Sequence, residues 1–146
     1  MPVEAVDYLT VGDGELIIKV AGVALNPIGP RRPPLQLAAI PLHPGFDIAG
    51  TVVEFGSGVV SFTSGDCVLA LATGFTAREG AFREYFVVVT NLVTSIPKTL
   101  PFADAAVLPL GLAAAAGLLY ESGGLGLNLP RVSHGDDAQD KRTIII

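Results

Sequence analysis

The sequence predicts a mainly β fold, a meander or small barrel of strands followed by two short helices. Short apolar runs rich in β-branched residues alternate with turns, and the chain holds 17 glycines and 11 prolines among 146 residues. Half of the residues are apolar and only 16% are charged, so the chain can bury a core as about one domain. The pattern changes from strand-like to helical only after Pro101.

The stretch from Pro44 to Leu71 is the centre of this prediction. Asp47–Phe55 and Cys67–Leu71 are apolar runs that predict strands. Between them, Gly56-Ser57-Gly58 is expected to supply the positive-φ positions of a tight turn. Val59, Val60 and Phe62 form a short second apolar patch, and Ser64-Gly65-Asp66 is a second turn signal. The stretch therefore predicts strands joined by turns and excludes a helix.

A further strand is predicted before this centre. Residues 15–25 follow the turn Gly12-Asp13-Gly14 and form an apolar run. Residues 26–34 contain four prolines, which exclude the interior of a regular strand or helix and predict a loop.

Two helices and a final strand are predicted near the end of the chain. Pro101 suits the first turn of a helix, and residues 111–120 form a second helix that ends near Gly123-Gly124. Residues 129–140 are polar and predict a linker, while residues 141–146 begin a buried strand.

Composition excludes several classes of function. A net charge of −5 without a large basic cluster makes nucleic acid a poor partner. The single cysteine, Cys67, excludes an internal disulfide and a cysteine-rich zinc site. No secretory leader is visible and no apolar run reaches the ~18–20 residues of a membrane span, so we expect a soluble cytoplasmic protein.

Several segments carry a resemblance to one protein family. GFDIAGTVVEFGSGVVSFTSGDCVLAL, residues 45–71, resembles the pattern G-x-D/E-x-A-G-x-V-x-x-V-G-x-x-V-x-x-F-x-x-G-D-x-V of the GroES-like catalytic domain in medium-chain dehydrogenase/reductases. GELIIKVAGVALNP and GAFREYF, which begin at Gly14 and Gly80, resemble further strands of that domain. AAVLPLGLAAAAGLLY, which begins at Ala105, resembles text of the fungal enoyl-reductase-like and quinone-reductase-like members.

The resemblance implies a fold and a division into domains. Residues 1–128 would form a GroES-like, partly open β-barrel with two short C-terminal helices. Residues 129–146 would be a linker and the first strand of a Rossmann domain, truncated before its glycine-rich phosphate turn.

The resemblance also implies a function. A full-length relative would pass hydride from NADPH to the C=C bond or quinone of a small-molecule substrate, bound in the cleft between the two domains. We expect this chain alone to be inactive, without tight NADPH binding, or to need a complementing chain that supplies the cofactor domain. The alternative is a non-catalytic GroES-like barrel used for binding or assembly, and the oligomeric state stays open.

Four residues are implied by resemblance alone. Asn26 and Arg31 match positions near the cofactor, and the alternatives are a turn residue for Asn26 and a solvated loop arginine for Arg31. Asp47 and Tyr85 match the substrate cleft, although a structural carboxylate and strand packing are the alternatives. No catalytic residue is assigned, and the family's Ser-Thr pair is replaced by Ala113-Ala114.

The resemblance implies a zinc-independent member, with no metal site. Phe46 stands where zinc-dependent relatives have a histidine, and the first loop has no cysteine. His43 beside two prolines is expected to be a surface residue, and Cys67 a small residue buried within a strand.

Overall fold

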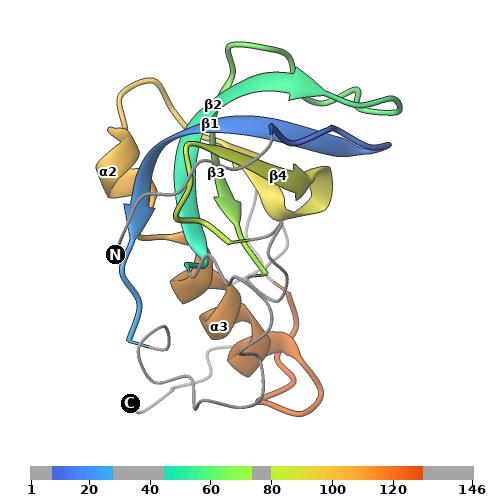
Figure 1. Ribbon diagram of the computed structural model, residues 1–146. Coiled ribbons are helices and arrows are strands. Elements are labelled where there is room, and N and C mark those ends of the chain that lie inside the picture. The colour runs from blue at the N-terminus through green and yellow to red at the C-terminus, as the bar shows by residue number, and fades with distance from the viewer. Residues whose placement is uncertain (1–7, 28–44, 74–79, 130–146) are drawn as a thin grey trace, which may run out of the picture. The chain divides into compact units, whose positions relative to one another are not determined.

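The computed structural model describes residues 8–27, 45–73 and 80–129 (Figure 1). In order, its elements are β1 (Glu15–Ala24), β2 (Asp47–Phe55), β3 (Cys67–Leu71), β4 (Tyr85–Val89), η1 (Thr90–Leu92), β5 (Val93–Ser95), α2 (Phe102–Ala105) and α3 (Pro109–Tyr120). The strands form one antiparallel sheet in the order β4-β1-β2-β3-β5. The predicted mainly β fold with two short helices at its C-terminal end is confirmed.

The chain divides into two compact units between Ala114 and Ala115. The first contains the sheet, α2 and the start of α3. The second contains the end of α3 and the turn that follows it. The predicted boundary at residue 128 stays a prediction, because the predicted linker and last strand lie almost wholly outside the described residues.

Strands β1 and β2 are the long central pair of the sheet (Figure 1). Their register runs from Leu16 opposite Phe55 to Ala24 opposite Asp47, with irregularities after Ile17 and Val20. Gly50 permits the close approach of these strands, because a Cβ there would collide with the carbonyl oxygen of Lys19.

Successive residues of β2 point to opposite faces of the sheet, and both faces are covered. Ile48 and Val52 belong to the larger core, whereas Ala49 belongs to a second cluster with Ala105 and Ala106. The larger core is a set of fully buried aliphatic and aromatic side chains that includes Leu16, Ile18, Val68 and Phe86. The second cluster holds α2 against β1 and β2, so the short helix is part of the folded domain.

The connection from β2 to β3 has turns at residues 57–58 and 64–65, where the sequence predicts them, but the apolar patch between them is not a strand. Gly58 adopts the expected positive φ of 76°, but Gly56 is not among the positive-φ glycines. Glycine is needed at position 56 because a Cβ there would collide with the carbonyl oxygen of Gly12. Residues 56–66 form an irregular connection in which Phe62 is buried and Val60 is 93% exposed.

The two helices are separated by a short break. Pro101 precedes the first residue of α2, and Pro109 is the first residue of α3, where a missing N–H costs no helical hydrogen bond. The whole segment Phe102–Tyr120 has 19 residues and a hydropathy of 1.8, which passes the length and composition test for a membrane span. The prediction that no apolar run reaches the length of a membrane span is therefore wrong by this test of length and composition.

Candidate functional site

The buried carboxylate of Asp47 is the centre of the candidate site. Asp47 is 1% exposed and is the buried charged residue of the described core. Its Oδ2 accepts a hydrogen bond from Nδ2 of Asn26 at 2.6 Å, and its Oδ1 accepts one from the backbone N–H of Leu110 at 2.6 Å. Both oxygens of the buried Asp47 carboxylate therefore accept a hydrogen bond, which compensates for the loss of hydration on burial.

Local structure brings these three residues together. Asp47 begins β2 and faces Ala24 near the end of β1, and Asn26 follows two residues after Ala24. Leu110 is the second residue of α3, within the first turn, whose N–H groups have no partner inside the helix. The negative charge at this position also complements the positive end of the helix dipole. Asp47 thus ties the end of β1, the start of β2 and the start of α3 to one another.

The donor from Leu110 was missed by the sequence analysis. A backbone N–H carries no side-chain signature, so the sequence text around residue 110 does not single it out. Pro109 was the available signal, because proline at the first helical position leaves the next N–H groups pointing out of the helix start.

Tyr85 lies away from this group. On β1, Tyr85 faces Lys19 whereas Asp47 faces Ala24, and five residues of extended strand span about 17 Å. Tyr85 instead meets Tyr8 edge to face, with ring centroids 5.2 Å apart. The structure therefore brings Asn26 and Asp47 together and leaves Tyr85 in another group.

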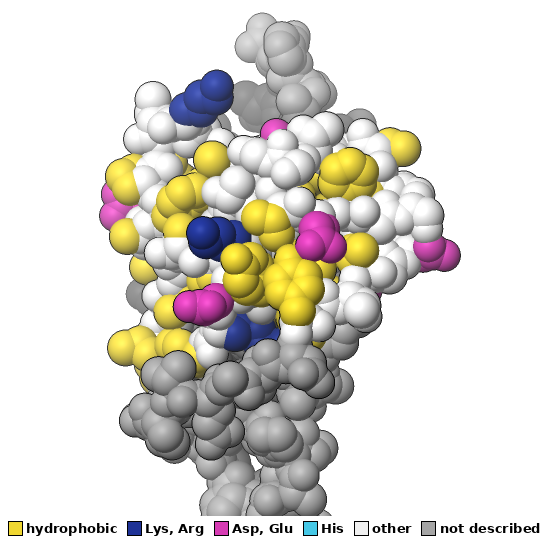
Figure 2. Space-filling view, turned by 45° about the horizontal axis from the view of Figure 1, so that its top comes forward, with side chains coloured by type: hydrophobic (Ala, Val, Ile, Leu, Met, Phe, Trp, Pro, Cys, Tyr) yellow, Lys and Arg dark blue, Asp and Glu magenta, His cyan; other side chains and the backbone are white. Residues whose placement is uncertain are grey.

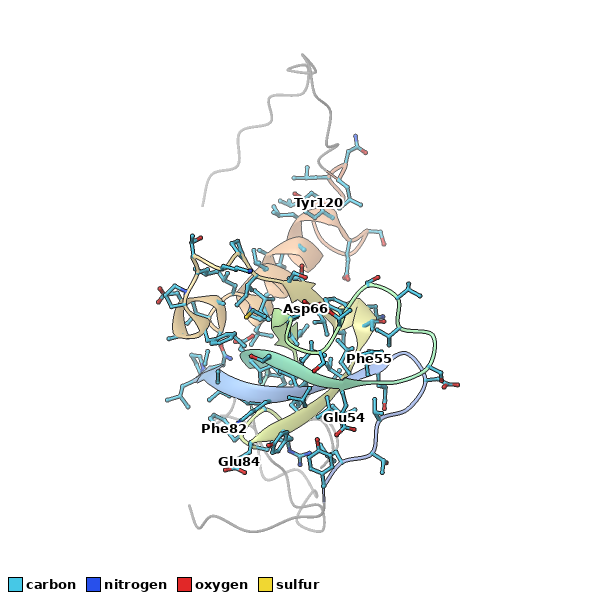
Figure 3. The ribbon with its side chains drawn as sticks, turned by 90° about the horizontal axis from the view of Figure 1, so that it is seen from above. Glu54, Phe55, Asp66, Phe82, Glu84 and Tyr120 are labelled. Atoms are coloured by element: carbon cyan, nitrogen blue, oxygen red, sulfur yellow. The ribbon has the colours of Figure 1, made fainter. Side chains whose placement is uncertain are left out.

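The second group is exposed and carries a carboxylate. The hydroxyl of Tyr8 donates to Oε1 of Glu54 at 2.8 Å. This hydrogen bond, with smaller contributions from desolvation and from the negative charge of Glu54, raises the pKa of Tyr8 above its ordinary value. Glu54 and Glu84 point to the same side of the sheet (Figure 3), and hydrophobic side chains lie among charged ones on the face in Figure 2.

Two other predicted positions fall outside the described residues. Arg31 and His43 belong to residues 28–44, so their predicted roles are neither supported nor contradicted. Cys67 is half-buried at the start of β3 and packs against the second cluster, in agreement with a packing role. Among residues 8–27, 45–73 and 80–129, no group of three or more potential ligands could hold a metal ion.

The described residues do not form a site for the phosphates of a dinucleotide around Asp47. Such phosphates are bound by free N–H groups at a helix start or by cationic side chains. At the start of α3, the N–H of Leu110 already donates to the Asp47 carboxylate, whose negative charge would repel a phosphate. The side-chain amide of Asn26 already donates to Asp47, and no reaction step follows from this pair alone.

A small pocket also lies apart from Asp47. It measures about 70 Å³ and is lined mainly by β4, from Phe86 to Val89, together with Glu15, Leu71, Thr73 and Leu92. Ligand sites in proteins usually measure about 300–1,000 Å³, so this pocket is too small for a drug-sized substrate.

Comparison with known proteins identifies relatives of this chain. Residues 12–98 match the family described as alcohol dehydrogenase GroES-like domain. The dehydrogenase pigH of Monascus ruber is 39% identical over 140 residues, which cover 89% of this chain and 38% of that protein. The trans-enoyl reductase himH of Aspergillus japonicus is 37% identical over 136 residues, which cover 90% of this chain and 39% of that protein. The chain therefore spans about two fifths of the length of these curated relatives.

Solved structures share the fold. An alcohol dehydrogenase superfamily protein from Novosphingobium aromaticivorans superposes with a TM-score of 0.69 at 28% identity, covering 80% of this chain and 36% of the other. The quinone oxidoreductase of Escherichia coli, solved in complex with NADPH, has a TM-score of 0.64 at 21% identity and covers 82% of this chain and 36% of the other. This second likeness concerns the fold, and its NADPH belongs to the bacterial enzyme.

Proposed function

Because the chain belongs to the family of alcohol dehydrogenase GroES-like domains, we propose that it is the substrate-side domain of an NADPH-dependent reductase. The reaction would be of the enoyl or quinone reductase type, with hydride passing from C4 of the nicotinamide to an activated C=C bond or a quinone. The observation that carries this proposal is the extended similarity to relatives that are named dehydrogenase and trans-enoyl reductase. We place the activity in the cytosol and without zinc.

Asp47 would have a positioning role in this reductase. Its two oxygens are occupied by Asn26 and Leu110, so it would hold the cleft-side end of β1 in place rather than transfer a proton. Asn26 would contact the nicotinamide, and Arg31 would lie near the cofactor. Tyr85 would contact substrate only if the substrate also reached the group around Tyr8. A substrate role for Tyr85 is therefore supported less than the roles proposed for Asn26, Arg31 and Asp47.

The same observations favour weak or no binding of NADPH by the chain alone. Phosphate binding needs groups that the described part of the chain does not bring together around Asp47, and the relatives are more than twice as long. We therefore propose that the 146-residue chain is inactive by itself. A non-catalytic barrel is the second candidate, and it is favoured by the fully engaged carboxylate at the centre of the candidate site.

A fusion protein tests the proposal. Residues 1–128 would be joined to the part of the Monascus ruber dehydrogenase that follows its match, and NADPH oxidation would be followed with enones and with quinones. We expect turnover by the fusion and a roughly tenfold lower kcat/KM for its Asn26→Ala variant, with Val60→Ala as the matched control. An NADPH-binding fusion that reduces neither acceptor class would support the non-catalytic barrel instead.

The unmodified chain provides the complementary measurement. Nicotinamide fluorescence would be titrated with NADPH and NADH, alongside the Escherichia coli quinone oxidoreductase as a positive control. We expect no saturable binding in the micromolar range from a chain that still unfolds cooperatively. Saturable binding that is selective for NADPH would contradict the proposed inactivity of the chain.

A further inference from the structure

The side-chain hydroxyl of Thr73 is buried and has no hydrogen-bond partner among the residues that the structure describes. Thr73 lies two residues after the end of β3 and lines the pocket of about 70 Å³ beside β4. A buried hydroxyl without a partner destabilises a fold, because it loses its hydrogen bonds to water and gains none in return. The pocket therefore needs an occupant that can form a hydrogen bond with Thr73.

The pocket follows the free edge of β4. All four residues from Phe86 to Val89 line it. Consecutive residues of a strand point to opposite faces of the sheet, so a pocket that touches four in a row runs along an edge of the strand. One edge of β4 is paired with β1, and within the described sheet β4 has no neighbour on its other edge. Leu71 and Thr73 line the same pocket, which therefore lies between β4 and the end of β3.

The backbone N–H and C=O of Val87 face this free edge. The N–H of Val20 donates to the carbonyl of Glu84 at 2.8 Å. The N–H of Thr90 donates to the carbonyl of Gly14 at 3.0 Å. Bonded pairs alternate along an antiparallel ladder, so Val87 falls between them and directs its backbone groups away from β1. Val87 is only 4% exposed, and no backbone hydrogen bond of the described turns and loops reaches it.

We infer that the pocket is a hydration site, in which about two ordered water molecules bridge the hydroxyl of Thr73 to the backbone of Val87. A water molecule occupies about 30 Å³ in the liquid, so the pocket volume of about 70 Å³ accommodates two. Water both donates and accepts, which an N–H, a C=O and a hydroxyl together require. The two waters connect β4 to the end of β3, which strand pairing in the described sheet does not connect.

Other occupants fit the pocket less well. An apolar molecule would leave the hydroxyl of Thr73 and the backbone groups of Val87 without partners. A peptide strand added along β4 would need room for several residues, which a pocket of this size does not offer. A small cation could approach Glu15, but Oε2 of Glu15 already accepts the N–H of Gly12 at 2.8 Å, and the N–H of Val87 would oppose a positive charge.

The test uses the full chain without cofactor or substrate. Nuclear Overhauser effects from water to the amide proton of Val87 would be measured by NMR for the wild-type chain and for Thr73→Val, Thr73→Ser and Thr94→Val. Thr94 is the matched control, because it is an exposed threonine of β5. Thermal unfolding of the same four proteins would be measured in sodium chloride, ammonium chloride and choline chloride.

We expect the effect at Val87 in the wild type, in Thr73→Ser and in Thr94→Val, and at least a threefold loss in Thr73→Val. The Tm of Thr73→Val should fall by about 2–5 °C, because the waters lose one of their partners, while that of Thr94→Val changes by less than about 1 °C.

Absence of the effect in the wild type would overturn the inference whether or not the variants fold. So would an unchanged effect in Thr73→Val, or a higher Tm of this variant, since valine stabilises a dry pocket by removing an unpaired hydroxyl. A Tm that depends on the cation in the wild type but not in Thr73→Val would show an ion in place of water. Because neither readout involves NADPH or turnover, the result is independent of the proposed reductase function.

Discussion

Asp47 accepts a 2.6 Å hydrogen bond from the backbone N–H of Leu110, 63 residues further along the chain. The carboxylate is 1% exposed, and the donor belongs to the first turn of α3. This one contact fixes where the helix begins relative to the start of β2. The position of the helix start therefore depends on a side chain of the sheet.

Replacing Asp47 with alanine is expected to destabilise the domain by about 2–4 kcal/mol, since the N–H of Leu110 and the amide of Asn26 both lose their acceptor. Asp47→Asn should cost less, about 1–2 kcal/mol, because the amide oxygen can still accept one of the two hydrogen bonds. Urea denaturation measures both. Glu84→Ala is the control, because Glu84 is exposed and should change stability by less than about 0.5 kcal/mol.

Asn26 and Asp47 are expected to be energetically coupled, because they are in direct contact. A double-mutant cycle with Asn26→Ala and Asp47→Ala should give a coupling free energy of about 1–2 kcal/mol, since the pair shares one hydrogen bond. The same cycle between Asn26 and Tyr85 should give a value near zero, because Tyr85 lies on a distant part of the sheet. A coupling of Asn26 to Tyr85 as large as that to Asp47 would contradict the separation of the two groups.

Alanine should have opposite effects at two glycines. Gly50→Ala forces a Cβ onto the carbonyl oxygen of Lys19, so we expect a loss of about 2–4 kcal/mol or failure to fold. Gly111→Ala lies inside α3 with open space around it, so we expect a gain of about 0.5–1 kcal/mol from helix propensity. The unfolding midpoints of both variants and of the wild-type chain measure these effects. A Gly50→Ala variant that is more stable than the wild type would refute the close approach of β1 and β2.

Alkaline pH should weaken the fold through Tyr8. Its pKa is raised above 10.0 mainly by the hydrogen bond to Glu54, so the folded state holds the phenol proton more tightly than the unfolded state does. The resulting stabilisation is complete below the unfolded pKa and is lost as pH rises through the folded pKa. In a Tyr85→Phe, Tyr120→Phe background, phenolate absorbance should show that Glu54→Gln lowers the pKa of Tyr8. An unchanged titration would argue against the hydrogen bond.

The strands of the fold could be predicted because their apolar runs are continuous and are bounded by turn residues. Asp47–Phe55 and Cys67–Leu71 were predicted with the bounds that the structure gives. The turns predicted at Gly56-Ser57-Gly58 and Ser64-Gly65-Asp66 lie where the structure has turns, but the apolar patch between them forms no strand. Gly56 is required for the close approach of Gly12, which a local pattern cannot show. Val60 was part of an apolar patch in the sequence, yet it is almost fully exposed.

The candidate site was predictable only in part. Asn26 and Asp47 were chosen by resemblance, and the structure adds that they bond each other. Leu110 could not be chosen, because its contribution is a backbone donor brought close by tertiary folding. The exposure of α3 could not be predicted either, because the apolar sequence of a helix predicts that its side chains are buried.

The edge of β1 that pairs with β4 stays unpaired for a long part of synthesis, because β4 is made much later than β1. Glu15 pairs with Val89, 74 residues later in the chain. At about 5–20 residues per second, a ribosome needs about 4–15 s to make the intervening chain. Throughout that interval the apolar β1 has one unpaired edge that can join a strand of another nascent chain. Chaperone dependence during translation is thus expected to arise at β1, before α2 and α3, the α-helices of the described residues, have been made.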